Sequence, residues 1–347
     1  MKDTGLTKTQ ATAYFLIIAT FTLTLTSCAG LAGAAPAPTP ESEDTIAGKT
    51  LDGVASAGPA REPAFLLDYD GTTVNTFVIG DPRAVRRVVF IHGWAGSGAE
   101  FIDLAERLSA DRPDIACFCV DLPGSGSSGK PLGAPYDVPY FRAAIRVIVE
   151  AASRYGLPDG RSAADVTLVG HSLGGHFSAD YAARDGYGID RLALVSPAGW
   201  PGEVGAMQAW ASKNDLTLSL VPKFITEETY VAGHKLMMFF SDSGYSEAAP
   251  RYTGRLLATP EGRAALEAIT RNALEKDCVD DALDDIAVPV LLAWGRNDPV
   301  LPFSYAEKFL SRLPAGARFE PFDRCGHMPH CERAPELAVI LSEFIGL

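Results

Sequence analysis

Basic side chains, zinc-binding cysteine patterns and long apolar runs are scarce or absent in this chain. The 30 lysines and arginines are outnumbered by 43 aspartates and glutamates, which gives a formal net charge of −13. A surface this acidic argues against nucleic acid or another anionic polymer as a partner. The 6 cysteines form no C-x-x-C pair and no His/Cys spacing typical of zinc. We therefore expect neither a metal ion nor an organic cofactor.

An apolar stretch near the start of the sequence, residues 11–26, is too short for a comfortable membrane span. With Lys2 and Lys8 before it, the stretch is typical of a signal peptide. It ends in Leu25-Thr26-Ser27-Cys28, which resembles the bacterial lipobox. That resemblance implies that residues 1–27 are removed and that Cys28 is acylated, and two or more acyl chains anchor a protein stably to a lipid bilayer. We expect a lipid-anchored, extracytoplasmic protein of the bacterial cell envelope, in the outer membrane if the host has one. Ordinary secretion and an uncleaved anchor are the alternatives.

Residues 28–60 are predicted to form a flexible tether, because they are rich in Ala, Gly, Pro, Ser and Thr and lack apolar periodicity. Beyond them, short apolar runs alternate with stretches of helical spacing, which predicts an α/β fold with a mostly parallel sheet covered by helices on both faces. The predicted strands are 65–69, 74–79, 88–91, 115–120, 166–169, 192–195, 290–294 and 318–322. The predicted helices are 100–108, 138–155 with Asp137 as its cap, one that begins with a Ser304/Glu307 capping box, and one that begins at Pro335.

About ninety residues separate the strands at 192–195 and 290–294, too many for a single crossover helix. We expect a helical cap over residues 197–288, placed on a core formed by residues 61–196 and 289–347. Such a cap would cover the carboxyl ends of the strands, where ligands bind in open α/β sheets. The cluster Leu236-Met237-Met238-Phe239-Phe240 is expected to form its core, with part of the cluster lining an apolar pocket as the alternative.

Gly170-His171-Ser172-Leu173-Gly174-Gly175 is the most informative segment of the chain. It follows the apolar run 166–169 and opens a helical stretch. A serine on such a sharp strand-to-helix turn is typical of a nucleophile elbow. The glycines let the strand and the helix pass closely, and the N-terminus of the helix offers unpaired N–H groups to an oxyanion.

From residue 62 to the C-terminus the chain resembles the α/β-hydrolase family. Its motifs occur in the family's order: His92-Gly93-Trp94, Asp121-Leu122-Pro123-Gly124, the elbow, Gly295-Arg296-Asn297-Asp298 and Gly326-His327-Met328-Pro329-His330. The resemblance implies an α/β-hydrolase fold with eight strands and a cap after strand 6.

The order Ser, Asp, His along the chain is the one this fold uses for a catalytic triad. It assigns Ser172 as nucleophile, His327 as general base and acid, and Asp298 as the group that orients the imidazole. The backbone N–H of Leu173 and, by the resemblance, that of Trp94 would form the oxyanion hole.

The remaining histidines are expected to be structural. His92 should hydrogen-bond within the oxyanion loop, His171 and His176 should pack beside the elbow or face solvent, and His330 should stabilise its loop. His234 lies in the predicted cap, where contact with substrate is the alternative. Cys117 and Cys119 are expected to be buried on one face of a strand. The sequence does not decide whether Cys325 and Cys331 form a disulfide.

These residues predict a serine hydrolase that cleaves carboxylic esters of small-molecule substrates through an acyl-enzyme intermediate. The same triad also serves amide or peptide cleavage, C–C bond or lactone hydrolysis, and acyl transfer, and the sequence leaves these reactions open. A non-catalytic binding lipoprotein is a third possibility, disfavoured because it predicts a broken triad.

Overall fold

The computed structural model of the chain describes residues 65–158, 160–202, 221–241 and 245–346. The predicted signal peptide, Cys28 and the tether lie outside these residues, and so does part of the predicted cap. Within the described ranges, no helix has the length and apolar character needed to cross a bilayer.

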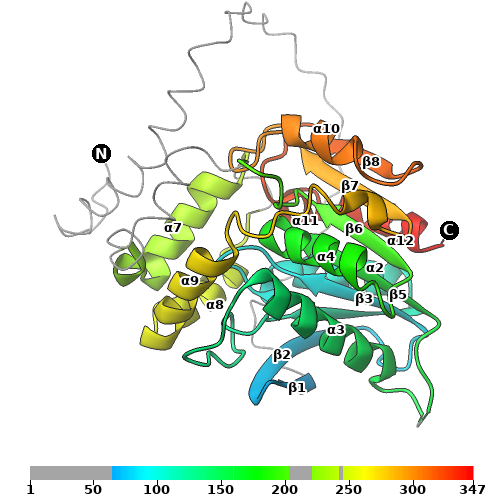
Figure 1. Cartoon of the computed structure of the whole chain (residues 1–347), viewed down its shortest axis with the longest axis horizontal. Coiled ribbons are helices and arrows are strands. Elements are labelled where there is room, and N and C mark those ends of the chain that lie inside the picture. The colour runs from blue at the N-terminus through cyan, green and yellow to red at the C-terminus, as the bar shows by residue number, and fades with distance from the viewer. Residues whose placement is uncertain (1–64, 159, 203–220, 242–244, 347) are drawn as a thin grey trace, which may run out of the picture.

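Eight strands form a single sheet in the order β1-β2-β4-β3-β5-β6-β7-β8, which confirms the predicted mostly parallel sheet (Figure 1). The β1–β2 and β2–β4 pairs are antiparallel and all other pairs are parallel. The strands are β1 Phe65–Tyr69, β2 Thr72–Ile79, β3 Arg86–Ile91, β4 Ile115–Val120, β5 Asp165–His171, β6 Arg191–Val195, β7 Val290–Gly295 and β8 Arg318–Phe322.

The central strands are buried on both faces, which is why they read as continuous apolar runs in the sequence. In β3, Val88 and Phe90 point into one hydrophobic cluster, whereas Val89 and Ile91 point into the other, and all four are fully buried. Cys117 and Cys119 share one face of β4, as predicted, and both are buried.

Helices cover both faces of the sheet (Figure 1). A 3-10 turn, η1 (Gly98–Phe101), leads into α2 (Ile102–Asp111), which packs beside α12 (Ala334–Gly346) on one face. The other face carries α3 (Val138–Arg154), α4 (Ser172–Arg184) and α10 (Ser304–Leu310).

The Asp137 cap of α3 is confirmed, because its side chain accepts a hydrogen bond from the Tyr140 N–H. The capping box predicted at Ser304 is wrong. Phe303 occupies the cap position with helical backbone angles, so Ser304 already lies inside the first turn, and no side chain caps this helix.

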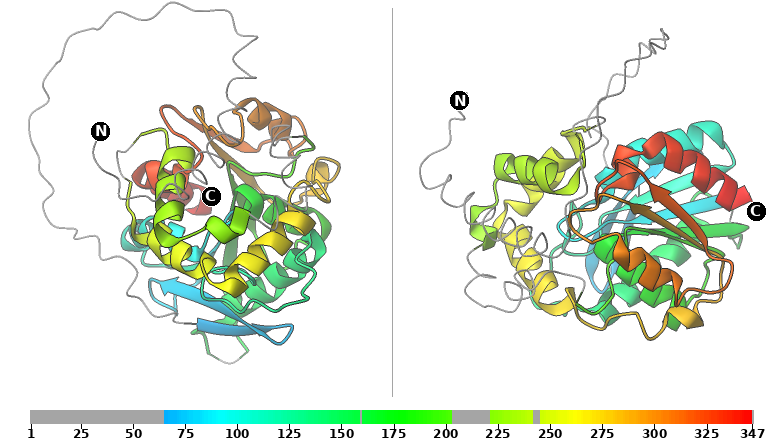
Figure 2. Two further views of the ribbon diagram at one scale, coloured as in Figure 1. Left: turned by 90° about the vertical axis from the view of Figure 1, so that its left-hand side faces the viewer. Right: turned by 90° about the horizontal axis from the view of Figure 1, so that it is seen from above.

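The segment between β6 and β7 contributes η2 (Val221–Phe224), α7 (Glu227–Met238), α8 (Ala248–Leu257), α9 (Pro260–Ala273) and η3 (Leu283–Asp285). Figure 2 shows α7, α8 and α9 gathered at one end of the sheet. Their contacts identify that end. Tyr230 donates to the Ala95 carbonyl just after β3, and Tyr252 donates to the Asp121 carboxylate just after β4. The inserted helices therefore lie over the carboxyl ends of the parallel strands.

Candidate active site

Ser172 lies on the predicted strand–turn–helix, between the end of β5 and the first turn of α4. Its φ is +51°, in the left-handed region that is strained for a residue with a β-carbon. A β-carbon at Gly170 would lie 2.5 Å from the Gly174 carbonyl oxygen, and one at Gly174 would lie 2.2 Å from the His92 carbonyl oxygen. Both positions therefore require glycine, and their close packing holds the serine in its strained turn.

His327 and Asp298 meet at the same end of the sheet. His327 Nδ1 lies 2.7 Å from Asp298 Oδ2, and both side chains are almost fully buried. The other carboxylate oxygen, Oδ1, accepts the N–H groups of Val300 and Leu301, each at 2.8 Å. These two bonds fix the carboxylate, so that it accepts the imidazole Nδ1–H and leaves Nε2 as the basic nitrogen.

The backbone around His327 ties this pair to the elbow and to an inserted helix. The His327 N–H donates to the Met238 carbonyl of α7 at 2.8 Å. Its ring centroid lies 4.7 Å from that of His171, the residue before Ser172. Among the described residues, the His327 side chain bonds to Asp298, and no hydrogen bond joins it to Ser172 Oγ.

The two residues predicted for the oxyanion hole flank the elbow. Leu173 is buried in the first turn of α4. Trp94 follows β3 next to Gly93, where a β-carbon would come 2.9 Å from Ser172 Cβ, so this loop is in close contact with the nucleophile turn. The Trp94 indole donates to Thr270 Oγ1 of α9 at 2.8 Å.

His92 supports this loop as predicted. Its Nδ1 bonds to the Gly93 carbonyl at 2.8 Å, and its Nε2 accepts the Leu122 N–H at 3.1 Å. Burial lowers the pKa of His92, which keeps it neutral in this role.

A small apolar pocket lies beside the elbow and the loop that contains Trp94. Three of its walls come from the inserted helices: Leu257 of α8, and Leu266 and Ile269 of α9. The remaining lining residues are His92, Gly93, Trp94, Ala95, Leu122, Gly124, Ser125, Phe141, Leu173 and Phe177.

The other four histidines are all buried, so none of them faces solvent. His176 Nε2 bonds to the Asp277 carbonyl at 2.9 Å, and burial lowers its pKa to about 4. His171 Nε2 bonds to the His327 carbonyl at 2.9 Å. His330 stacks on Phe101, with ring centroids 4.5 Å apart. His234 Nε2 lies 4.0 Å from a carboxylate oxygen of Glu100.

Glu100 is a buried acidic residue near the site that no motif in the sequence indicates. It lies in η1 and is 6% exposed, and burial, with a contribution from the nearby Asp121 charge, raises its pKa to about 8. No sequence motif marks a glutamate whose burial depends on how four distant elements pack.

Cys325 and Cys331 are both free thiols, so the disulfide that the sequence allowed between them is not formed. The Cys331 thiol contacts the Glu100 carbonyl oxygen at 3.5 Å.

Comparison with known proteins identifies the family of this chain. The sequence profile of the alpha/beta hydrolase fold matches residues 86–334, which is most of the chain. The chain belongs to the alpha/beta hydrolase family. As a family member it is a hydrolase, and its sheet and helices are those of the alpha/beta hydrolase fold.

Several curated relatives of this alpha/beta hydrolase carry the name pimeloyl-[acyl-carrier protein] methyl ester esterase. The protein of that name from Neisseria meningitidis serogroup A is 28% identical over 275 residues, covering 76% of this chain and 78% of the relative. The one from Aromatoleum aromaticum is 28% identical over 265 residues, covering 74% of this chain and 97% of the relative.

Solved structures share the fold of this alpha/beta hydrolase. An esterase from Exiguobacterium antarcticum superposes with a TM-score of 0.64 at 22% identity, covering 82% of this chain and 100% of that one. A membrane phospholipase A superposes with a TM-score of 0.63 at 24% identity, covering 81% of this chain and 85% of that one.

Proposed function

We propose that this alpha/beta hydrolase cleaves carboxylic esters, with Ser172 as nucleophile, His327 as general base and acid, and Asp298 as the residue that orients the imidazole. The observation that carries the proposal is the 2.7 Å bond between His327 Nδ1 and Asp298 Oδ2, formed beside a serine held at a φ of +51°. The ester-cleaving names of the curated relatives support the same reaction.

In the proposed reaction, His327 Nε2 takes the Ser172 hydroxyl proton as Oγ attacks the ester carbonyl. Asp298 stabilises the imidazolium that forms. The imidazolium then gives its proton to the departing alcohol, which leaves an acyl group on Ser172. A water molecule, activated by the same imidazole, releases the acid and restores the serine.

The carbonyl oxygen gains negative charge at each addition step. The N–H of Leu173, at the start of α4, and the N–H of Trp94 are proposed to donate to it, and one such donor contributes about 3 kcal/mol to transition-state stability. Support for this assignment comes from the close approach of Gly93 to Ser172 Cβ, which brings the two donor segments together.

The apolar lining of the pocket supports an acyl chain as the part of the substrate that binds there. The residues that line it include Trp94 and Leu173, the proposed oxyanion residues, and Leu266 and Ile269 of α9. An acyl chain bound with its carbonyl at the oxyanion residues would therefore extend toward the inserted helices.

A substrate panel tests the proposed function. We expect p-nitrophenyl esters of short and medium acyl length to be hydrolysed by the wild type and not by Ser172→Ala. Matched anilides, a lactone and a vinylogous diketone measured in parallel separate the other reactions available to this triad. Faster turnover of any of these than of every ester would contradict ester cleavage as the main activity.

We also propose that the enzyme acts outside the cytoplasm, tethered to a membrane through acylated Cys28. The basis is the lipobox-like sequence before Cys28 and the following Ala- and Pro-rich residues. Labelled palmitate should enter the wild-type protein and not Cys28→Ala in a bacterial host. Label in neither protein, with normal secretion into the medium, would contradict the tether.

A further inference from the structure

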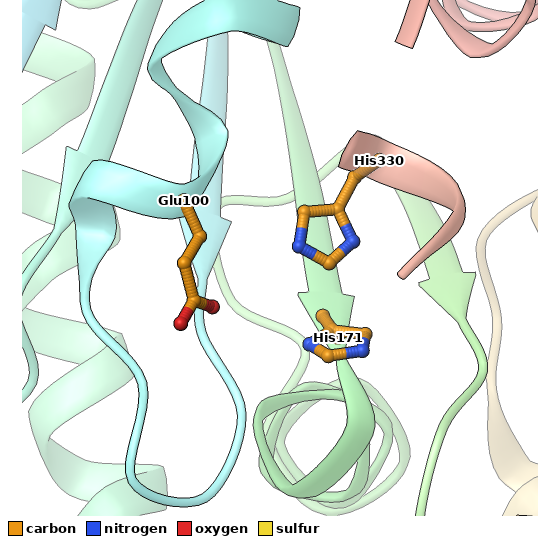
Figure 3. Close-up of side chains that lie close together, drawn as sticks. All are labelled: Glu100, His171 and His330. Atoms are coloured by element: carbon orange, nitrogen blue, oxygen red, sulfur yellow. The ribbon is translucent and has the colours of Figure 1, made fainter. Parts of the chain in front are cut away.

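A buried cluster of metal-ligand side chains is formed by Glu100, His171 and His330 (Figure 3). It lies next to the proposed triad, because the ring centroid of His171 is 4.7 Å from that of His327. Glu100, His171 and His330 each place a carboxylate oxygen or an imidazole nitrogen within 4.8 Å of the others, and all three side chains are buried. They come from three separate elements, η1, the end of β5 and α11 (Pro329–Glu332). His234 of α7 lies at the edge of this cluster, with its Nε2 4.0 Å from Glu100 Oε1.

The hydrogen-bond state of these side chains is unusual for a protein interior. His171 Nδ1 and both ring nitrogens of His234 and of His330 are buried with no hydrogen-bond partner in the described part of the chain. Buried polar atoms are nearly always satisfied, so several adjacent exceptions require an explanation. Figure 3 shows the Glu100 carboxylate on one side and the two imidazole rings of His330 and His171, one above the other, on the opposite side.

His171 is arranged as a metal ligand usually is. Its Nε2 bonds to the His327 carbonyl oxygen at 2.9 Å, and a carbonyl only accepts, so Nε2 carries the proton. The lone pair is therefore on Nδ1, the atom that points into the cluster without a partner. A metal-binding histidine typically donates its second nitrogen to a carbonyl in this way.

Glu100 brings the oxygen ligand to this cluster. Its side chain is almost fully buried, and among the described residues its one ion-pair contact is with His234, whose Nε2 lies 4.0 Å from Oε1. A carboxyl oxygen that faces buried imidazoles can bind a divalent ion, and any proton on the carboxyl is released as the ion binds.

We propose that Glu100, His171 and His330 bind a divalent transition-metal ion of the zinc type, and that His234 moves inward to supply the fourth ligand. Three neutral imidazoles and one carboxylate are ligands that Zn²⁺ accepts in tetrahedral sites. With bonds of about 2.1 Å, such ligands lie about 3.4 Å apart, so Glu100, His171 and His330 would contract around the ion and His234 would move further to reach it. The ion would join η1, β5, α7 and α11, and through His171 it would hold the carbonyl of His327.

Metal binding by the full chain tests this site directly. The protein is stripped with a chelator and titrated with Zn²⁺ by calorimetry and with Co²⁺ by visible absorption, which reports the coordination geometry. We expect one ion per chain, a tetrahedral Co²⁺ spectrum, and a rise in melting temperature on adding Zn²⁺. Glu100→Gln and His330→Gln should each weaken binding by roughly 100-fold or more and remove the rise in melting temperature.

His176→Gln is the matched control, because it replaces an equally buried histidine that bonds to the Asp277 carbonyl away from the cluster. It should bind Zn²⁺ as the wild type does. Ser172→Ala should also bind normally, which separates this proposal from the proposed function. Absence of a stoichiometric ion in the wild type, or binding unchanged in Glu100→Gln, would overturn the site. If His330→Gln does not fold, the near-isosteric Glu100→Gln decides the matter.

Discussion

His327 Nδ1 bonds to Asp298 Oδ2 at 2.7 Å and so joins the loop after β8 to the loop after β7. Asp298→Asn tests what this bond does. The asparagine oxygen can still accept the N–H groups of Val300 and Leu301, but its amide would donate to Nδ1. The proton of His327 would then reside on Nε2, where it blocks proton transfer from Ser172. We expect kcat for ester hydrolysis to fall by about 10⁴.

The melting temperature of Asp298→Asn serves as its control, because the fold should survive this near-isosteric change. A variant that melts like the wild type and retains full activity would show that Asp298 does not orient the catalytic base.

Gly174 tests the packing of the elbow. A β-carbon there would lie 2.2 Å from the His92 carbonyl oxygen and 2.5 Å from that of Ile91. Gly174→Ala should therefore displace backbone at the end of β3 and lower both the free energy of unfolding and the esterase activity.

Gly233, in α7, is the matched control for Gly174→Ala. No atom lies within 4 Å of its would-be β-carbon, and Gly233 has no positive φ. Gly233→Ala should raise the free energy of unfolding by up to about 1 kcal/mol, because alanine favours a helix over glycine. Urea unfolding of both variants measures the contrast, and an equal effect of the two substitutions would contradict this account of the elbow.

Ile269 tests the pocket as the acyl site. Ile269→Ala should enlarge the pocket at its α9 wall and raise kcat/KM for medium-length acyl esters relative to acetate esters, by roughly tenfold. Ile286→Ala removes the same atoms from a comparably buried position outside the pocket. Both substitutions should destabilise the protein by about 2–5 kcal/mol. An identical acyl preference in the two variants would exclude this pocket as the acyl site.

His176 gives a prediction for pH. Burial lowers its pKa from 6.5 to about 4 in the folded protein. The unfolded chain therefore binds this proton first, and stability falls as the pH drops from 6.5 toward 4. At pH 5 the loss from this group is about 2 kcal/mol.

His176→Gln keeps a donor for the Asp277 carbonyl and removes the titration. Urea unfolding at pH 7.5 and pH 5 should show a smaller loss of stability in the variant than in the wild type. Equal losses in both proteins would rule out this effect of His176.

Much of the fold could be predicted because local patterns carry it. The buried strands are continuous apolar runs, and Asp137 caps α3 with a side chain three residues before the N–H that it binds. The capping box at Ser304 failed because the backbone of Phe303 is already helical, and the sequence does not specify where the first turn begins. The division into residues 61–196, 197–288 and 289–347 stays a prediction.

Some residues of the candidate site can be predicted from the sequence, and others cannot. Ser172, Asp298 and His327 are predicted from their motifs, each of which follows a predicted strand, and the structure joins two of them by the bond between His327 and Asp298. The cluster of Glu100, His171, His234 and His330 has no such signal. Its members are separated by scores of residues, and only tertiary packing shows that Glu100, His171 and His330 converge and that imidazole nitrogens of the three histidines are buried without partners in the described part of the chain. The proposed metal ion therefore departs from the expectation drawn from cysteine and histidine spacing.

Active-site labelling tests the central claim most directly. The protein is treated with a fluorophosphonate, which reacts with activated serines, and the modified peptide is identified by mass spectrometry. The account predicts one adduct, on Ser172, that is absent from Ser172→Ala and forms far more slowly in His327→Gln. A folded wild-type protein that gains no adduct, or gains it on another serine, would contradict the account.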